Sequence, residues 1–101
     1  GMPAFLDGLA EQHCTPRVMG SGTLALTGIS AGWAAAGVVH SFNPIDHLAG
    51  ILIAHEAGAE VLDEDGRATL VPILGRPVLV AAPGLGQRFV ALWRAARQTC
   101  A

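Results

Sequence analysis

The chain contains no lysine and no tyrosine, and only 14% of its 101 residues carry a charge at neutral pH. Its six basic residues are all arginines scattered along the sequence, and the formal net charge is −2. A protein that binds nucleic acid usually concentrates its basic residues in a patch or along one helix. The composition therefore argues against a nucleic-acid-binding function.

The shortage of charge also affects how the surface is covered. A typical soluble domain has about 25% charged residues, whereas hydrophobic residues make up 51% of this chain. Either an apolar face is paired with another surface, or a core of small Ala and Gly side chains inflates the hydrophobic count. We favour the first and expect a homo-oligomer, most simply a twofold dimer. The closing helix, with Phe89, Leu92 and Trp93, or the outer strand of the sheet is the expected interface.

Long hydrophobic runs are absent as well, and we expect no secretory leader. The apolar runs are interrupted by His, Gly and Pro well short of the roughly 20 residues that span a bilayer, so the sequence predicts a cytoplasmic protein without a membrane segment. Cys14 and Cys100 match no metal-binding spacing and are expected to be free thiols. Gly1 before Met2 is typical of a residue left by tag removal, which leaves residues 2–101 as one domain.

Hydrophobic periodicity predicts strands that alternate with helices. Helices are expected at 4–12, 23–34, 43–57 and 87–98, and strands at 17–19, 37–42, 59–62, 68–73 and 78–82, the last of them apolar enough to be central. An acidic turn at 63–66 would join two strands in a hairpin, and it lacks the ligand spacing of a calcium loop. Gly28 and Gly32 would let their helix approach the sheet closely. Repeated strand-to-helix units indicate an α/β fold with a mostly parallel β-sheet flanked by helices.

The segment 43–58 carries the clearest helix signals in the chain. Asn43 can cap a helix, Pro44 suits its first position, and Gly58 can end it. Asp46 then lies in the first turn, where two roles fit a carboxylate. It can accept hydrogen bonds from free N–H groups and complement the helix dipole, or it can bind a metal ion at the helix N-terminus. Spacing alone favours the capping role.

A second strand-to-helix turn, Gly-Ser-Gly at 20–22, precedes the helix expected at 23–34. Ligands of parallel α/β sheets bind at the carboxyl ends of the strands. Both turns should therefore lie on one rim, where each helix N-terminus offers N–H groups to an anion. Taken alone, the glycine turn is more often a tight turn with a serine cap.

The histidines form no recognisable metal site. His47 and His55 are eight residues apart on one helix, about 12 Å between Cα atoms, which is too far for joint ligation. His40 could lie near Asp46, although a surface histidine or a hydrogen-bonded core histidine is the default interpretation. Ser21 has no histidine and carboxylate at a recognisable spacing, so a serine hydrolase is unsupported.

Residues 45–50, Ile-Asp-His-Leu-Ala-Gly, are followed by Glu-Ala-Gly-Ala at 56–59. This pattern resembles the C-terminal signature of the inositol monophosphatase superfamily, Trp-Asp-x-Ala-Ala-Gly followed by an apolar stretch and Glu-Ala-Gly-Gly. Upstream, 20–26 resembles the family's Gly-Ser-x-Ala-Leu-x-Leu turn, and Ala-Gly at 31–32 matches its Ala-Gly. Residues 61–66 and 77–83 resemble its later strand, turn and closing strand. The chain thus resembles the C-terminal domain of that family over nearly its whole length.

The sequence also departs from the family pattern. Ile45 replaces the aromatic residue before the aspartate, Val39 stands where inositol-specific members have an acidic residue that contacts the sugar, and Ala25 replaces an aspartate often found in the first helix. The family builds most of its metal site in an N-terminal half, from a glutamate motif and from Asp-Pro-x-Asp-Gly-Thr or Ser. Residues 43–47, Asn-Pro-Ile-Asp-His, imitate the second motif only superficially.

The resemblance implies a Mg²⁺-dependent phosphomonoesterase that acts on small phosphorylated polyols or nucleotides. In that role Asp46 would bind one Mg²⁺, and Ser21, Gly22 and Thr23 would line the substrate pocket. The chain would be inactive alone, either as a component whose N-terminal half is a separate polypeptide or as a remnant. The alternative is a non-catalytic domain that self-associates or binds a small phosphorylated ligand.

Overall fold

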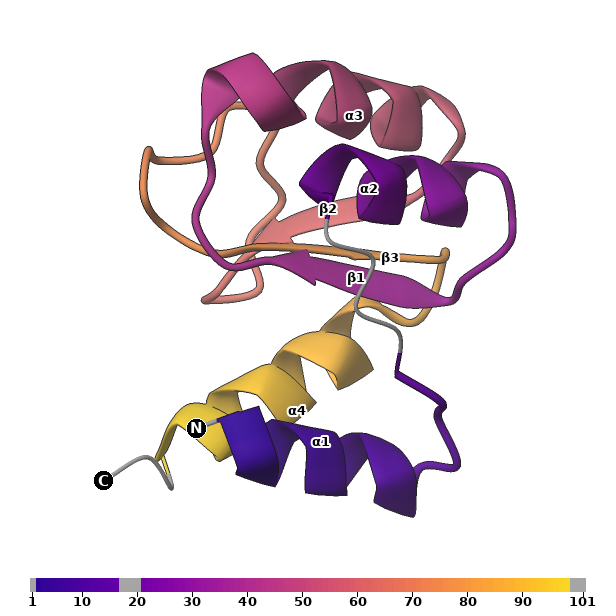
Figure 1. Ribbon diagram of the computed structural model, residues 1–101, viewed down its shortest axis with the longest axis vertical. Helices are drawn as coiled ribbons and strands as arrows, with labels where there is room; N and C mark the ends of the chain where they lie inside the picture. Colours follow the sequence, from indigo (N-terminus) through magenta and orange to yellow (C-terminus); the bar gives the residue numbers. More distant parts are fainter. Residues whose placement is uncertain (1, 17–20, 99–101) are drawn as a thin grey trace.

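The computed structural model describes residues 2–16 and 21–98. Its elements follow in the order α1 (Met2–Glu11), α2 (Gly22–Ser30), β1 (Ala36–Val39), α3 (Pro44–Glu56), β2 (Glu60–Asp63), β3 (Val78–Ala81) and α4 (Gly86–Gln98). Helices α2 and α3 cover one face of the sheet, while α4 lies under the other face and packs against α1 (Figure 1). The arrangement is an α/β fold with helices on both sides of a small sheet.

The sheet has three strands in the order β1-β3-β2, and β3 is antiparallel to both neighbours. The predicted mostly parallel sheet is therefore wrong. The sequence correctly suggests a strand-helix-strand unit, since β1, α3 and β2 follow one another and both strands run in the same direction. However, β3 lies between β1 and β2. Because the segment from β2 to β3 contains no crossover helix, β3 enters the sheet in the opposite direction.

Strand β3 is buried along its whole length, which confirms that the last predicted strand is central. Its alternate residues supply two separate cores, as the period of a strand requires. Val78 and Val80 join a cluster under α2 and α3, whereas Leu79 joins a cluster under α4. Strand β3 thus packs against both helical layers, one on each face of the sheet.

The apolar stripe of α4 belongs to the second core. Phe5 on α1 lies with its ring centroid 5.8 Å from that of Phe89 and 5.3 Å from that of Trp93, in tilted and edge-to-face geometry. Such aromatic pairs add to the stabilisation from burial. The expected interface on α4 is therefore wrong for Phe89 and Trp93, because α1 and the sheet already bury both side chains.

Helices α2 and α3 pack closely where Gly50 meets Leu26. A Cβ atom at Gly50 would lie 2.9 Å from Leu26 Cδ1 and 3.2 Å from Leu26 Cβ. Distances this short leave no room for a side chain, so glycine sets the approach of the two helices. Gly28 makes no such contact, because its added Cβ would touch only the Trp33 ring at 3.8 Å. The predicted role of Gly28 in close packing is therefore wrong.

Both helices of this layer end in the same way. The chain adopts a positive φ at Gly32 after α2 and at Gly58 after α3, of 81° and 91°. At the end of α3, Ala59 N–H donates to Ala54 O and Gly58 N–H donates to His55 O. This pair of bonds is the Schellman motif, and it requires a residue that tolerates the left-handed conformation. The predicted end of α3 at Gly58 is confirmed, while α2 ends four residues earlier than expected.

The predicted hairpin after β2 forms only in part. The Asp63 carboxylate accepts hydrogen bonds from the N–H groups of Asp65 and Arg67, which closes the acidic turn. Beyond it, a single bridge joins Leu62 to Ala68, and residues 68–73 form no strand. The strand predicted at 17–19 lies outside the described residues. Cys14 is an exposed free thiol, as predicted, and no helix in the described residues is long and apolar enough to cross a membrane.

Candidate functional site

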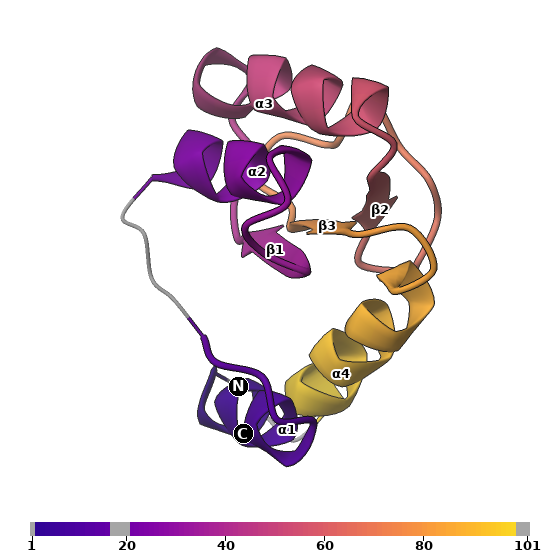
Figure 2. The same cartoon turned by 90° about the vertical axis from the view of Figure 1, so that its right-hand side faces the viewer.

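The two helix N-termini singled out in the sequence lie at the same end of the α2–α3 layer. In both views the helices run side by side and begin on the same side of the sheet (Figures 1 and 2). The predicted common rim is therefore present, although the sheet beneath it is antiparallel. The close contact between Gly50 and Leu26 holds the two N-termini in a fixed relation.

Asn43 caps α3 as the sequence predicts. It has extended backbone angles, and its Oδ1 accepts a hydrogen bond of 2.9 Å from Ile45 N–H. The reciprocal contact, expected from Asp46, comes instead from His47, since Asn43 N–H donates to His47 Nδ1 at 3.0 Å. Because His47 lies one residue further along the first turn, its longer ring reaches back to the cap. Sequence reasoning considered His47 only as a metal ligand and missed this role.

We expect replacement of His47 by alanine to cost on the order of 1 kcal/mol of unfolding free energy, because Asn43 N–H then loses its acceptor. His55→Ala in the last turn of the same helix is the matched control and should change stability by less than about 0.5 kcal/mol. Urea unfolding followed by circular dichroism measures both. Equal losses from the two variants would contradict the capping role of His47.

Ser21 caps α2, and its hydroxyl oxygen accepts a hydrogen bond of 3.2 Å from Leu24 N–H. The serine cap predicted from the Gly-Ser-Gly turn is thus confirmed. A hydroxyl that accepts in this way retains its own hydrogen for donation to another group. Gly22 and Thr23 follow as the first residues of α2, and the side chain of Thr23 lies outside the described atoms. The cap can therefore serve the helix and contact an anion at the same time.

Asp46 lies in the first turn of α3 with its side chain exposed on the rim. Its N–H donates to Asn43 O, which belongs to the helix cap. The nearby histidine considered in the sequence does not approach it. The ring of His40 packs on Trp93 of α4 at a centroid distance of 5.3 Å, which places it toward the opposite layer. Asp46 and His40 are therefore not brought together.

One exposed carboxylate does not make a complete site for a divalent cation. Mg²⁺ and Ca²⁺ take six or more oxygen ligands, and several normally come from protein carboxylates or bound substrate. Within residues 2–16 and 21–98, no group of three or more His, Cys, Asp and Glu side chains could hold a metal ion. Asp46 thus has the right donor chemistry for one ligand position, and the described residues do not fill the others.

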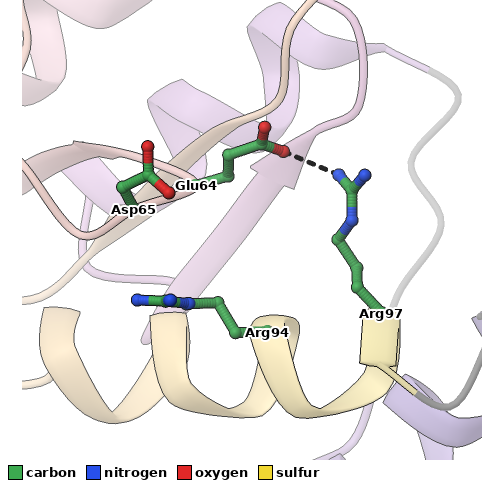
Figure 3. Close-up of a pocket in the computed structure, with 4 residues that line it drawn as sticks. All are labelled: Glu64, Asp65, Arg94 and Arg97. Atoms are coloured by element: carbon green, nitrogen blue, oxygen red, sulfur yellow. Dashed lines mark hydrogen bonds and ion pairs between the residues drawn. The ribbon is translucent and has the colours of Figure 1, made fainter.

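The acidic turn after β2 has a structural role. Glu64 forms ion pairs with Arg76 and with Arg97, the latter at 2.6 Å, and its side chain is only 14% exposed. A hollow of about 220 Å³ beside α4 is lined by Glu64, Asp65, Arg94 and Arg97 (Figure 3). Because the Glu64 carboxylate is already engaged by two guanidinium groups, it is poorly placed to bind a cation. The ion pair between Glu64 and Arg97 thus joins the acidic turn to α4.

Glu60 is another residue whose role the sequence did not reveal. Its Oε2 accepts a hydrogen bond of 2.7 Å from Gly86 N–H, at the start of α4. The two residues are 26 positions apart, so no local spacing signals the contact. A carboxylate from β2 thus satisfies an N–H group at the helix N-terminus and complements the dipole of α4. Glu60 therefore contributes to the fold rather than to the rim.

The sequence model of the inositol monophosphatase family matches residues 2–98. This chain belongs to the inositol monophosphatase family. The match extends over both helix N-termini of the rim, so the site lies within the family domain. A comparison with curated proteins gives no match.

Two solved structures share the fold. An inositol monophosphatase from Anabaena (Nostoc) sp. PCC 7120 superposes with a TM-score of 0.69 at 23% identity, covering 78% of this chain and 31% of that chain. SaIMPase-II bound to inositol monophosphate gives a TM-score of 0.70 at 20% identity, covering 97% of this chain and 41% of that chain. The present chain thus spans about a third to two fifths of the length of these family members.

Proposed function

We propose that this chain is one component of a metal-dependent phosphomonoesterase and corresponds to the C-terminal part of the inositol monophosphatase fold. The observation that carries the proposal is the rim, where the N-termini of α2 and α3 lie together with the Ser21 hydroxyl and the Asp46 carboxylate. Free N–H groups and a hydroxyl suit a phosphate group, and a carboxylate suits the cation that accompanies it.

In this proposal Ser21, Gly22 and Thr23 bind the phosphorylated substrate. Their place at the start of α2 directs backbone N–H groups and the positive end of the helix dipole toward an anion. Asp46 supplies one ligand to Mg²⁺, which in such enzymes activates water and neutralises charge on the phosphate. The substrate class is small phosphorylated polyols or nucleotides, a proposal supported by the family match and by the inositol monophosphate bound to SaIMPase-II.

The remaining carboxylates must come from residues beyond those described. The two solved relatives have more than half of their length outside the region that this chain matches. We propose that an equivalent part, as a separate N-terminal half, completes the metal site next to Asp46. The chain alone would then supply the residues that bind the phosphate group and only one of the metal ligands, Asp46.

A non-catalytic remnant is the second candidate. Two observations favour it: no group of three or more His, Cys, Asp and Glu side chains in the described residues could hold a metal ion, and α3 exposes large apolar side chains. Such a domain would keep the helix N-termini as structural caps and would associate through its apolar surface. A remnant that only self-associates would not bind phosphate at the rim, and a remnant that binds a small phosphorylated ligand would differ from a phosphatase component in not binding Mg²⁺ through Asp46.

We expect the isolated chain to release no phosphate from inositol monophosphate above the blank at millimolar Mg²⁺. One carboxylate cannot hold the ions that this chemistry uses. Asp46→Asn provides the matched control, because it changes only the charge of the proposed ligand. Turnover that Asp46→Asn abolishes would show that this chain alone completes the metal site.

Phosphate binding separates a phosphatase component from a remnant that only self-associates. A phosphatase component should show shifts of the amide resonances of residues 21–24 in a ¹⁵N NMR titration with inositol monophosphate, and Ser21→Ala should weaken them. Inorganic phosphate and inositol are the reference ligands, since only the phosphate group is expected to reach the helix N-terminus. Saturating ligand without shifts at the rim would support the remnant instead.

A further inference from the structure

We propose that Glu64 is a positioning residue for the first turn of α3 and that it couples this turn to α4. The turn carries Asp46, which the proposed function assigns to Mg²⁺, so the consequence for catalysis rests on that proposed function. The placement of the turn rests only on contacts within the chain. Glu64 itself contacts neither metal nor substrate in this proposal, and it acts through two backbone segments that lie between it and the rim.

The first of these segments is the residue that precedes the N-cap of α3. Phe42 N–H donates to Arg76 O and Phe42 O accepts from Gly75 N–H, each at 3.0 Å, so the loop before β3 engages both backbone groups of Phe42. The side chain of Phe42 is only 2% exposed and belongs to the core under α2 and α3. A residue held by two hydrogen bonds and by burial fixes the direction in which the chain enters the helix.

The N-cap carries this placement into the first turn. Asn43 directly follows Phe42 in the sequence. Its backbone N–H donates to His47 Nδ1 at 3.0 Å, and its side chain accepts from Ile45 N–H at 2.9 Å. Asp46 lies between these two partners, and its N–H donates to Asn43 O. The position of Asp46 on the rim therefore depends on the backbone at Phe42.

The loop that holds Phe42 contains no helix or strand between 69 and 77. Its middle is fixed by the burial of Pro72, whereas four large side chains around it are exposed: Leu70, Val71, Ile73 and Leu74. Its end is a tight turn in which Arg76 N–H donates to Ile73 O at 3.0 Å. From this turn the Arg76 side chain forms an ion pair with Glu64. Arg76 thus holds Phe42 through its carbonyl group and Glu64 through its guanidinium group.

Glu64 is itself held in place. Its turn is closed by the Asp63 carboxylate, which accepts two backbone N–H groups of the same turn. Arg97 of α4 donates to the second carboxylate oxygen of Glu64 at 2.6 Å (Figure 3). The Glu64 side chain is only 14% exposed, against 59% for Arg76 and 54% for Arg97. Charge-assisted hydrogen bonds to a carboxylate shielded from water are stronger than exposed ion pairs. One carboxylate therefore connects the turn after β2, the loop before β3 and helix α4.

The same hollow contains two charged side chains without this role. Asp65 and Arg94 line it, and both are exposed. Neither takes part in an ion pair among the residues that the structure describes. Asp65 is adjacent to Glu64 on the same turn and carries the same charge, so Asp65→Asn is the matched control for a change at Glu64 and should leave the first turn of α3 as it is.

NMR spectra of the isolated chain test the proposal without any ligand. Glu64→Gln keeps the size of the side chain and removes its charge, so the amide resonances of residues 42–47 should shift in a protein that remains folded. Exchange of the Phe42 and Gly75 N–H groups with solvent should quicken about tenfold, because the loop opens more readily. Ala59 N–H, at the other end of α3, should exchange at the wild-type rate, since local opening there leaves the Glu64 ion pairs intact.

Salt and a change on α4 test the ion pairs themselves. The Debye length falls from about 10 Å at 0.1 M salt to about 3 Å at 1 M, so the same increase in salt should quicken exchange at Phe42 in the wild type and have little effect in Glu64→Gln. Arg97→Gln removes the link to α4 and should shift the resonances of 45–47 in the same direction as Glu64→Gln, by a smaller amount. Arg94→Gln, in the preceding turn of α4, is its control and should leave them in place.

Several results would overturn the proposal. Unchanged resonances at 42–47 in Glu64→Gln would show that the ion pairs do not position the turn. Equal acceleration of exchange at both ends of α3, or the same shifts from Asp65→Asn, would reduce Glu64 to a general contribution to stability or charge. Resonances unaffected by Arg97→Gln would disprove the coupling to α4. None of these measurements uses phosphate or Mg²⁺, so a rim that fails to bind inositol monophosphate would defeat the proposed function and leave this test in force.

Discussion

Replacing Gly50 by alanine is expected to destabilise the protein by on the order of 1–2 kcal/mol, although alanine is the better helix former. The added methyl group would lie 2.9 Å from Leu26 Cδ1 and 3.2 Å from Leu26 Cβ. Leu26 is only 1% exposed and cannot move aside without disturbing the core. Overpacking of this kind costs about 1–3 kcal/mol, which exceeds the gain of up to about 1 kcal/mol from helix propensity.

Gly28→Ala is the matched control for this prediction. Gly28 is also a buried helical glycine, but a Cβ there would make only an ordinary contact of 3.8 Å with Trp33. The propensity gain should then dominate and stabilise the protein by up to about 1 kcal/mol. Urea unfolding at one fixed protein concentration measures both variants, since association would otherwise change the apparent stability. Changes of the same sign and size would show that helix packing does not distinguish the two glycines.

The two glycines also show what a sequence can and cannot reveal. The four-residue spacing of Gly28 and Gly32 predicts close packing at these two glycines, yet α2 and α3 approach each other closely at Gly50 on α3. Spacing along one helix identifies a face, but it does not identify which neighbour meets that face. Gly32 is needed for its positive φ of 81°, a local requirement that the Ala-Gly pair at the helix end does signal.

Local signals predicted the N-caps of α2 and α3 and the end of α3, but not the end of α2. Asn43 and Ser21 act as N-caps, and Gly58 ends α3, as the sequence indicates. Each of these roles depends on residues within one turn, so single-residue chemistry determines them. The central position of β3 was also predictable, because a strand buried on both faces must be apolar throughout.

Predictions that depend on distant contacts were less successful. The direction of β3 follows from the path of residues 64–77, where the strand predicted at 68–73 does not form and no helix crosses over the sheet. The apolar stripe on α4 was correctly found but assigned to an intermolecular contact. Phe5 on α1 in fact covers it. An apolar stripe shows that one face of a helix is buried, but which element covers that face depends on the tertiary structure.

In the candidate site, too, the features set by local sequence were predictable and those set by distant contacts were not. The Ser21 cap followed from local turn chemistry, whereas the common rim followed from a rule for parallel sheets, although this sheet is antiparallel. His47 and Glu60 were missed, because His47 acts through its ring position and Glu60 caps a helix that begins 26 residues later. For Asp46 the structure supplies an exposed position on the rim, and its role as a metal ligand stays a proposal.

Replacing Leu26 by alanine is expected to cost about 2–5 kcal/mol, the range for large-to-small changes at buried leucines. Leu26 is among the most deeply buried side chains and joins α2 to α3 and the sheet. A domain of this size has only about 5–15 kcal/mol of total stability. The variant should therefore unfold at a markedly lower urea concentration than the wild type, as measured by circular dichroism.

Combining Leu26→Ala with Gly50→Ala tests directly whether the contact between these two residues causes the cost of Gly50→Ala. In a Leu26→Ala background the Cδ1 atom that clashes with the new methyl group is gone, and the methyl group instead fills part of the cavity. The cost of Gly50→Ala should then fall by on the order of 1 kcal/mol or more, a coupling of the size seen between contacting residues. Additive losses in this double-mutant cycle would contradict direct packing of Gly50 on Leu26, and with it the contact that fixes the two helix N-termini of the rim.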